Sequence, residues 1–258
     1  MERRMKLTAF DQYTDAYDMS NVKIKLKYDH TLRVAEISEK IAKSLGLSDE
    51  DIELAWQIGL LHDIGRFEQL RRFNTFKDAD SIDHAEFGAD LLFGENLIAE
   101  FDDEIENNPE RRLIVEKAVR YHSRYRLPED LNDHESMFCK IIRDADKVDI
   151  IRVNVELGLE DIYDVTTEEM LNAPMSEDVF ATLMEGRTVS KEVRRTVVDH
   201  LAGHIALAFE LEFPESRRIL REQGYYSKIL AFESKNDGTI KKMRAIREKA
   251  EKVLTGEE

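Results

Sequence analysis

Apolar residues recur at helical spacing along nearly the whole chain. After His30 the residues Leu32, Ala35, Ile37 and Ile41 share helical spacing, and Gly46 stands where a C-terminal cap would end the helix. Ser48 occupies the N-cap position of a second helix with an acidic first turn, which reaches His62 and ends or bends at Gly65. The pattern therefore predicts two consecutive amphipathic helices in this part of the chain.

The remaining pattern predicts further helices separated by polar loops. The stretch from Phe73 to Ser81 and the surroundings of Pro128 have the composition of loops, and the segment from Glu160 to Gly186 is acidic and broken by Pro174. The expected helix starts are near His84 with Asp83 or Ser81 as cap, at Pro109, near Ser136, at Ser190, at Pro214 and near Thr239.

The fold class follows from this pattern together with the scarcity of helix breakers. Only 11 Gly and 4 Pro occur among 258 residues, too few for the many tight turns of an all-β protein, and a hydrophobic fraction of 42% is enough for a core. We therefore predict an all-α fold. No repeat or Gly/Ser-rich linker divides the chain. The helical pattern of apolar residues changes after about Val153, and we place a soft domain boundary near residue 155 on this basis. This gives a helical bundle over residues 1–155 and a C-terminal helical extension over residues 156–258, which can pack on the bundle as part of the same globule.

The formal net charge of −16 limits the partners that the chain is expected to bind. A strongly acidic surface repels phosphate backbones, which argues against a nucleic-acid polymer as partner. A small phosphorylated substrate remains compatible, because metal ions can form a local cationic pocket inside an acidic shell.

Cysteine usage and hydropathy predict a cytoplasmic protein without a membrane partner. Cys139 is the only cysteine, so the chain forms no intramolecular disulfide and needs no oxidising compartment. The basic start from Met1 to Lys6 is followed by no apolar signal-peptide region, and no apolar run approaches the length of a membrane span.

Histidine and aspartate are distributed as expected for a metal centre built by several helices. Four histidines of the first half stand at or near predicted helix ends, one of them directly before an aspartate, and a further aspartate follows within a long predicted helix. These candidate ligands are His30, His62, Asp63, His84, His122 and Asp146. Imidazole and carboxylate ligands together suit Fe, Mn, Zn, Ni or Co, and helical bundles commonly build such sites from converging helices.

The order of these residues resembles the HD superfamily of metal-dependent phosphohydrolases. The segment from Tyr28 to Val34 resembles the first motif of that family, the segment from Leu60 to Arg66 its signature motif, and the segment from Asp144 to Asp149 its last motif. His84 and His122 match the two extra histidines of the binuclear subset. The resemblance covers roughly residues 25–149. The amino-acid sequence around His30 and over residues 67–84 also resembles a bacterial subgroup of the family.

The resemblance implies two divalent transition metals, with Fe or Mn favoured over Zn, Ni, Co or Mg. The first metal would be held by His30, His62, Asp63 and Asp146, and the second by Asp63, His84 and His122. Two divalent cations against two aspartates leave a positive site that suits a phosphate. Metals that share a bridging water lower its pKa, and the resulting hydroxide would attack phosphorus at neutral pH.

Three cations are candidates for binding the substrate. Arg66 follows the His-Asp pair by one turn and can clamp a phosphate as a bidentate donor, so Asp63 and Arg66 are the expected catalytic residues. Arg124 and Lys147 are weaker candidates for the same phosphate-binding role.

Several other residues have simpler interpretations than a ligand role. Asp144 competes with Asp146 as the last ligand, but the family motif favours Asp146, and Asp149 is expected to lie behind the ligands or at the surface. The histidine pair His200 and His204 has i, i+4 spacing but no glutamate after the first histidine, so a packing helix is favoured over a zinc site. His134 is expected to be solvated in a polar loop.

The leading hypothesis is a hydrolase of a small phosphorylated compound, a phosphomonoester or phosphodiester, with a nucleotide as one option. A di-iron oxygenase is the second, because the same six-ligand order occurs in relatives resembling myo-inositol oxygenase. The third is a non-catalytic metal or ligand sensor, which the complete ligand set disfavours because a structural site is normally closed by four ligands. The sequence leaves the substrate, the native metal and the oligomeric state open.

Overall fold

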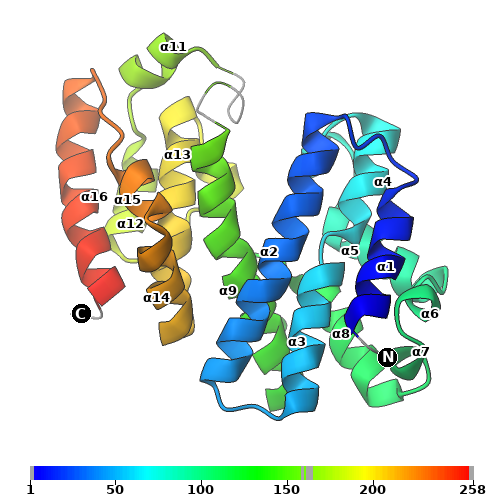
Figure 1. The fold of residues 1–258 in the computed structure, drawn as a ribbon. Coiled ribbons are helices and arrows are strands. Elements are labelled where there is room, and N and C mark those ends of the chain that lie inside the picture. Colours follow the sequence, from blue (N-terminus) through cyan, green and yellow to red (C-terminus); the bar gives the residue numbers. More distant parts are fainter. Residues whose placement is uncertain (1–2, 158–159, 161–164, 256–258) are drawn as a thin grey trace. The chain divides into compact units, whose positions relative to one another are not determined.

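The computed structural model describes residues 3–157, 160 and 165–255, and the regular elements of these residues are all helical (Figure 1). The predicted all-α fold is confirmed. The chain divides into two compact units, Met1–Asp146 and Lys147–Glu258, and the division falls inside helix α9, Asp133–Glu156. None of the described helices has the length and apolar character needed to cross a membrane.

The first unit contains eight further α-helices among the described residues. They are α1 Arg3–Thr14, α2 Val22–Ser44, α3 Asp49–Leu61, α4 Ile64–Phe73, α5 His84–Ala89, α6 Ile98–Phe101, α7 Asp103–Glu106 and α8 Pro109–Tyr121. A 3-10 turn at Asp78–Asp80 lies within the predicted loop before α5, and a π-helical turn at Asp90–Gly94 follows α5. The N-terminal helix α1 was not expected from the sequence pattern.

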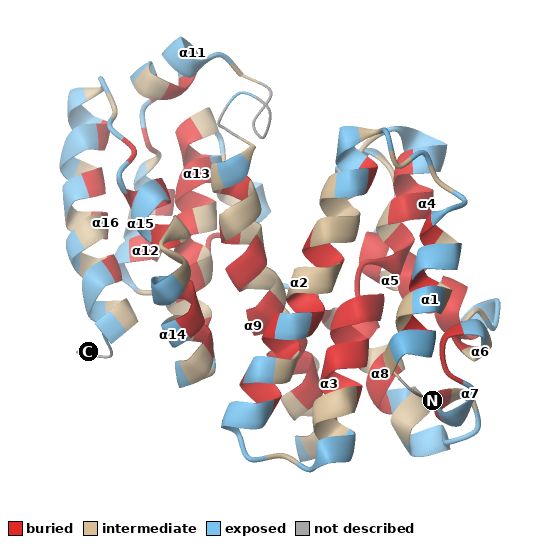
Figure 2. Cartoon of the chain, viewed as in Figure 1, coloured by how far each residue is buried: buried red, intermediate tan, exposed pale blue. Residues whose placement is uncertain are grey.

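Helix α3 is the central element of this unit. It begins as predicted, since the Ser48 side chain accepts a hydrogen bond from the Asp51 backbone N–H and three acidic residues occupy the first turn. Its second half is buried on all sides (Figure 2). Gly59 allows α2 to approach closely, because a Cβ atom there would lie 2.6 Å from the Cα atom of Ala35. The close contact brings the histidines of α2 and α3 into one region.

We expect Gly59→Ala to destabilise the protein. The added methyl meets the Ala35 backbone, which cannot rotate away, and such overpacking costs about 1–3 kcal/mol. That cost exceeds the gain of roughly 0.5–1 kcal/mol that alanine brings to a helix interior. Denaturant unfolding should show a lower free energy of unfolding. Gly94→Ala is the matched control, because nothing lies within 4 Å of its added Cβ. Equal stability of the two variants would contradict the prediction.

The chain bends between α3 and α4, two residues before the position that the sequence suggested. Asp63 has φ −105° and ψ 19°, outside the helical range, and α4 begins at Ile64. Gly65 serves packing instead. A Cβ atom there would lie 2.5 Å from the His84 carbonyl oxygen and 2.8 Å from the Gly88 backbone nitrogen. Gly65 therefore lets the start of α5 lie directly against the start of α4.

Several helix starts of the first unit follow the sequence signals. Asp83, one of two candidates, is the N-cap of α5 and accepts hydrogen bonds from two backbone N–H groups. Pro109 occupies the first turn of α8 as predicted. Helix α9 begins at Asp133, earlier than the expected start near Ser136, so the prediction of a loop around His134 is wrong. Its imidazole Nε2 lies 3.3 Å from an Asp51 carboxylate oxygen.

The second unit contains the end of α9 and these further described helices: α11 Thr167–Asn172, α12 Glu177–Met184, α13 Val197–Ile205, α14 Pro214–Gln223, α15 Tyr225–Leu230 and α16 Asp237–Thr255. Pro214 opens α14 as predicted. Ser190 was expected to cap the long helix here, but it caps only a 3-10 turn at Lys191–Val193. The helix begins at Val197 because Thr196 and Asp199 form a capping box.

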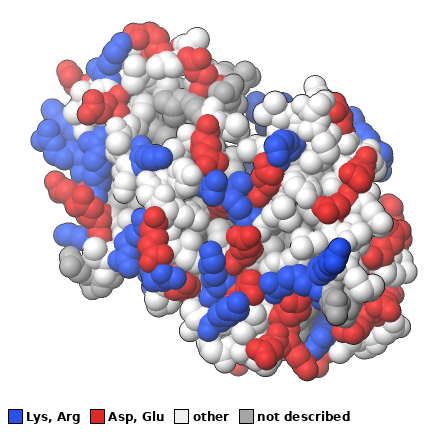
Figure 3. All heavy atoms as spheres, in the orientation of Figure 1, with Lys and Arg blue, Asp and Glu red and all other residues white. Residues whose placement is uncertain are grey.

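The charged side chains drawn in Figure 3 show both signs interspersed over the visible face. Many of them form short-range pairs, such as Arg218 with Glu215 and Glu222 on α14. Exposed pairs of this kind contribute little to stability, roughly 0–1 kcal/mol each. The charge pattern of this face therefore marks solvated helix surfaces and does not by itself define a binding site.

Candidate metal centre

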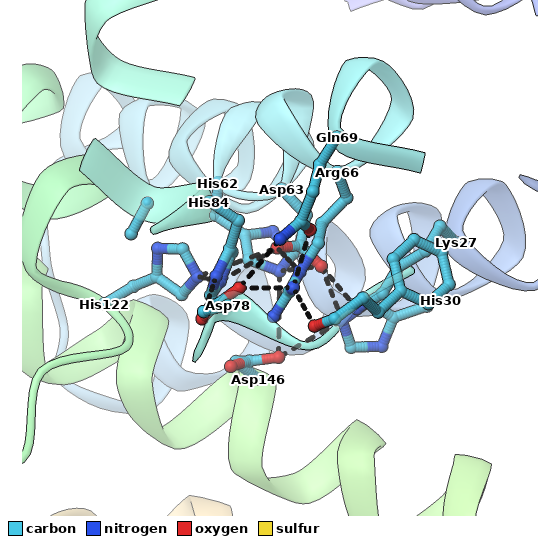
Figure 4. A network of polar contacts seen from close by, with 12 residues as sticks. Lys27, His30, His62, Asp63, Arg66, Gln69, Asp78, His84, His122 and Asp146 are labelled. Carbon is cyan, nitrogen blue, oxygen red and sulfur yellow. Dashed lines mark hydrogen bonds and ion pairs between the residues drawn. The ribbon is translucent and has the colours of Figure 1, made fainter. Parts of the chain in front are cut away.

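Four imidazoles and two carboxylates from five helices and one helix junction converge in the first unit (Figure 4). They are His30 on α2, His62 at the end of α3, Asp63 at the α3–α4 junction, His84 at the start of α5, His122 at the end of α8 and Asp146 on α9. The structure thus brings together all six residues that the sequence proposed as ligands. These residues form three groups in which the ligand atoms lie within 4.8 Å of one another, so each group could hold a metal ion. The groups are His30, His62 and Asp63; His62, His122 and Asp146; and Asp63, His84 and His122.

Asp63 lies between two histidine pairs and turns one carboxylate oxygen towards each. Its Oδ2 is 3.6 Å from His30 Nε2 and 3.5 Å from His62 Nε2. Its Oδ1 is 3.5 Å from His84 Nε2 and 3.7 Å from His122 Nε2. A carboxylate placed in this way can bridge two cations.

Asp146 turns its Oδ1 towards the first of these histidine pairs. Its Oδ1 lies 3.1 Å from His30 Nε2 and 3.7 Å from His62 Nε2. The competing candidate Asp144 and the neighbouring Asp149 are fully buried and belong to none of the three groups. The geometry therefore favours Asp146 as the aspartate of α9 that faces the centre.

Hydrogen bonds at Nδ1 fix three of the histidine rings. His62 Nδ1 lies 2.7 Å from the Gly59 carbonyl oxygen, and His122 Nδ1 lies 2.7 Å from the Val119 carbonyl oxygen. His84 Nδ1 lies 2.8 Å from Asp78 Oδ2. Because a carbonyl oxygen can only accept, Nδ1 carries the hydrogen in the first two rings, and an ionised Asp78 requires the same of His84. In each neutral ring Nε2 then carries the lone pair and is the atom directed at the centre.

Two observations show that the centre fits a cation. His84 Nε2 and His122 Nε2 lie only 3.0 Å apart. Both rings donate from Nδ1, so both Nε2 atoms carry a lone pair. These two lone pairs would repel each other unless both bind a positive charge. In addition, His62 Nε2 is buried and makes no hydrogen bond, although it faces the two aspartates. Buried polar atoms are almost always satisfied, so this arrangement is typical of a site that holds a metal ion.

The electrostatic environment keeps the centre in a metal-ready protonation state. Burial lowers the pKa of His62, and burial together with the positive charge of Arg66 lowers the pKa of His84 to about 4. Burial raises the pKa of Asp63, but the combined effect of Lys27, neighbouring histidines and Arg66 outweighs it and holds that pKa well below its usual range. Neutral imidazoles and ionised carboxylates are the forms that bind metals.

Asp78 is a residue of this region that the sequence analysis missed. Its Oδ2 accepts from His84 Nδ1, while its Oδ1 accepts from Arg66 Nη1 at 2.8 Å and from Gln69 Nε2 at 3.0 Å. Arg66 Nη1 also donates to the Phe76 carbonyl oxygen at 2.7 Å. Arg66 is therefore tied to the loop before α5 through this nitrogen, and its phosphate-binding role stays a prediction. The sequence placed Asp78 in a loop, and nothing there signalled that the loop folds back onto His84.

Lys27 is a second residue that the sequence analysis missed. Its Nζ donates to Asp63 Oδ2 at 2.6 Å (Figure 4). The available signal was its position three residues before His30 on α2, which places both side chains on one face of the helix.

The remaining predicted residues lie in other surroundings. Arg124, half exposed, pairs with Glu86 at 2.6 Å, and Lys147 donates to the Glu210 carbonyl oxygen at 3.0 Å. Substrate binding by either residue stays a prediction. His200 and His204 lie on α13 and belong to none of the metal-capable groups among the described residues. Burial is the largest of the effects that lower the pKa of His204 to about 3.

Comparison with known proteins identifies the segment that carries the centre. Residues 28–151 match the family model of the HD domain. Searches of curated proteins and of solved structures each returned no match. The matched segment contains all six converging residues, so the part of the chain that carries the centre is similar to an HD domain.

Proposed function

We propose that the protein is a metal-dependent hydrolase of a small phosphorylated compound, a phosphomonoester or a phosphodiester. The observation that carries the proposal is the position of Asp63, whose two oxygens face two separate histidine pairs. HD domains are mostly metal-dependent phosphohydrolases, which supports the same conclusion.

The proposed first cation position is formed by His30, His62, Asp63 and Asp146, and the second by Asp63, His84 and His122. Nitrogen and carboxylate donors together suit Fe or Mn, with other divalent metals as further candidates. Divalent cations bound there would neutralise phosphate charge and lower the pKa of a nearby water.

The residues of the chain supply orientation and exclude bulk water. The Nδ1 hydrogen bonds of His62, His84 and His122 hold three rings in fixed directions, so the donor atoms need little rearrangement when a cation binds. Asp63 is 2% exposed and Asp146 is 14% exposed, so most of the centre is shielded from bulk water.

The test is hydrolysis by the purified full chain loaded with Mn²⁺ or Fe²⁺ and offered a panel of phosphomonoesters and phosphodiesters. We expect turnover of at least one ester, loss of turnover after chelation, and recovery when Mn²⁺ is restored. Bound metal without turnover of any ester would contradict the proposal. Oxygen consumption by the iron-loaded protein would then support the oxygenase alternative, and saturable ligand binding without any turnover would support a sensor.

A further inference from the structure

Two cationic side chains flank the carboxylate of Asp63, one at each oxygen. Lys27 Nζ lies 2.6 Å from Oδ2, and Arg66 Nε lies 3.6 Å from Oδ1. Both cations lie 5.7 Å from the centre of the Phe76 ring. Lys27, Arg66 and Phe76 therefore form one cluster beside the carboxylate that faces both histidine pairs.

The two cations differ in how firmly the protein holds them, although the Nε of Arg66 is buried and makes no hydrogen bond. Arg66 Nη1 donates to Gln69, Phe76 and Asp78, which ties this side chain to its own helix and to the following loop. The ammonium group of Lys27 has three N–H donors, whereas Asp63 Oδ2 is its one hydrogen-bond acceptor within residues 3–157, 160 and 165–255. Its side chain is 15% exposed, and two of its three donors have no acceptor among these residues.

We propose that Lys27 Nζ binds the phosphate group of the substrate, an inference that rests on the proposed function. A phosphate held at the cation positions beside Asp63 would lie next to this ammonium, which donates charge-assisted hydrogen bonds to anionic oxygens. The added positive charge favours a phosphate dianion over a monoanion. Lys27 therefore favours a phosphomonoester over a phosphodiester as the substrate of this centre.

The position of Lys27 beside Asp63 has a second consequence: its charge favours phosphate binding but opposes metal binding. Lys27 neutralises Asp63, so its ammonium competes electrostatically with a cation that binds the same carboxylate. Removing the charge of Lys27 is therefore expected to weaken phosphate binding while leaving Mn²⁺ binding equally tight or tighter. A merely structural role of Lys27 would weaken both.

The experiment compares Lys27→Met, Lys27→Arg and the control Lys25→Met with the unchanged full chain. Lys25 lies on the same helix, is 62% exposed and pairs only with Asp29 among the ion pairs of the described residues. Calorimetry first measures Mn²⁺ binding alone and then the binding of inorganic phosphate to the Mn²⁺-loaded protein. For Lys27→Met we expect about a 10- to 100-fold weaker phosphate affinity, the range for a lost charge-assisted hydrogen bond. Lys27→Arg should retain most of the affinity, and Lys25→Met all of it.

Unchanged phosphate affinity in Lys27→Met would overturn the inference, and so would a parallel loss of Mn²⁺ and phosphate affinity. The outcome is separable from that of the proposed function. If the protein hydrolyses phosphoesters but Lys27→Met binds phosphate normally, only this inference fails. If no ester is hydrolysed while phosphate binding still depends on Lys27, the assignment of Lys27 to a phosphate site stands and the hydrolase proposal fails.

Discussion

Asp63→Asn is expected to lose metal from both cation positions and to abolish phosphoester hydrolysis. The amide keeps the size of the side chain, so the buried site stays filled, but it removes the charge that both histidine pairs face. Removal of one electrostatic group from an active site commonly costs about 10²–10³ in rate. Loss of the shared carboxylate should exceed this, so we expect kcat/KM to fall at least about 10³-fold.

Metal content per chain and initial rates measure this effect directly. Asp29→Asn serves as the control, since Asp29 is 41% exposed and pairs with Lys25 at the helix surface. It should bind metal and turn over substrate like the unchanged protein. If Asp63→Asn retained hydrolysis within tenfold, Asp63 would not be the shared ligand and the proposed mechanism would be wrong.

Asp78→Asn is expected to weaken one cation position and to spare the other. Asp78 accepts from His84 Nδ1 and thereby directs His84 Nε2 to the centre, whereas His62 is fixed through the Gly59 carbonyl oxygen instead. Loss of such an orienting carboxylate typically lowers metal affinity about 10- to 100-fold. We therefore expect titration with Mn²⁺ to show one step near its original affinity and a second step that is weakened.

Asp80→Asn is the matched control, because Asp80 lies in the same 3-10 turn and is exposed. Asp78→Asn also removes the charge that pairs with Arg66, so a lower stability alone would not establish an orienting role. The ring nitrogens of His84 provide the specific readout by NMR, since the variant should no longer hold the hydrogen on Nδ1. Uniform weakening of both titration steps would count against the assignment.

The six converging residues were accessible from the sequence because their order and flanking motifs resemble a known family. The helices that carry them were predictable from apolar spacing and from helix-start signals such as Ser48, Asp83 and Pro109. A cap prediction fails where two signals compete. Ser190 and Thr196 both precede apolar runs, and Thr196 starts the helix because Asp199 completes its capping box.

Asp78 was not predictable, and Lys27 had only its helical spacing to His30 as a signal. Both act through tertiary contacts. Lys27 on α2 contacts Asp63 at the junction of α3 and α4, and Asp78 lies in a loop that turns back to His84 at the start of α5. Residue type carries little information for such contacts, because the chain has 38 basic and 54 acidic residues. Only the fold selects which of these charges lie beside the centre.

The carbonyl acceptors of His62 and His122 have a consequence for the dynamics of the helices. Gly59 and Val119 each lie in the last turn of their helix, where backbone carbonyls have no partner further along the helix. Each imidazole thus closes the end of the helix from which it projects. A cation that immobilises the two rings would also suppress fraying of the last turns of α3 and α8, so part of its binding energy would appear as local helix stability.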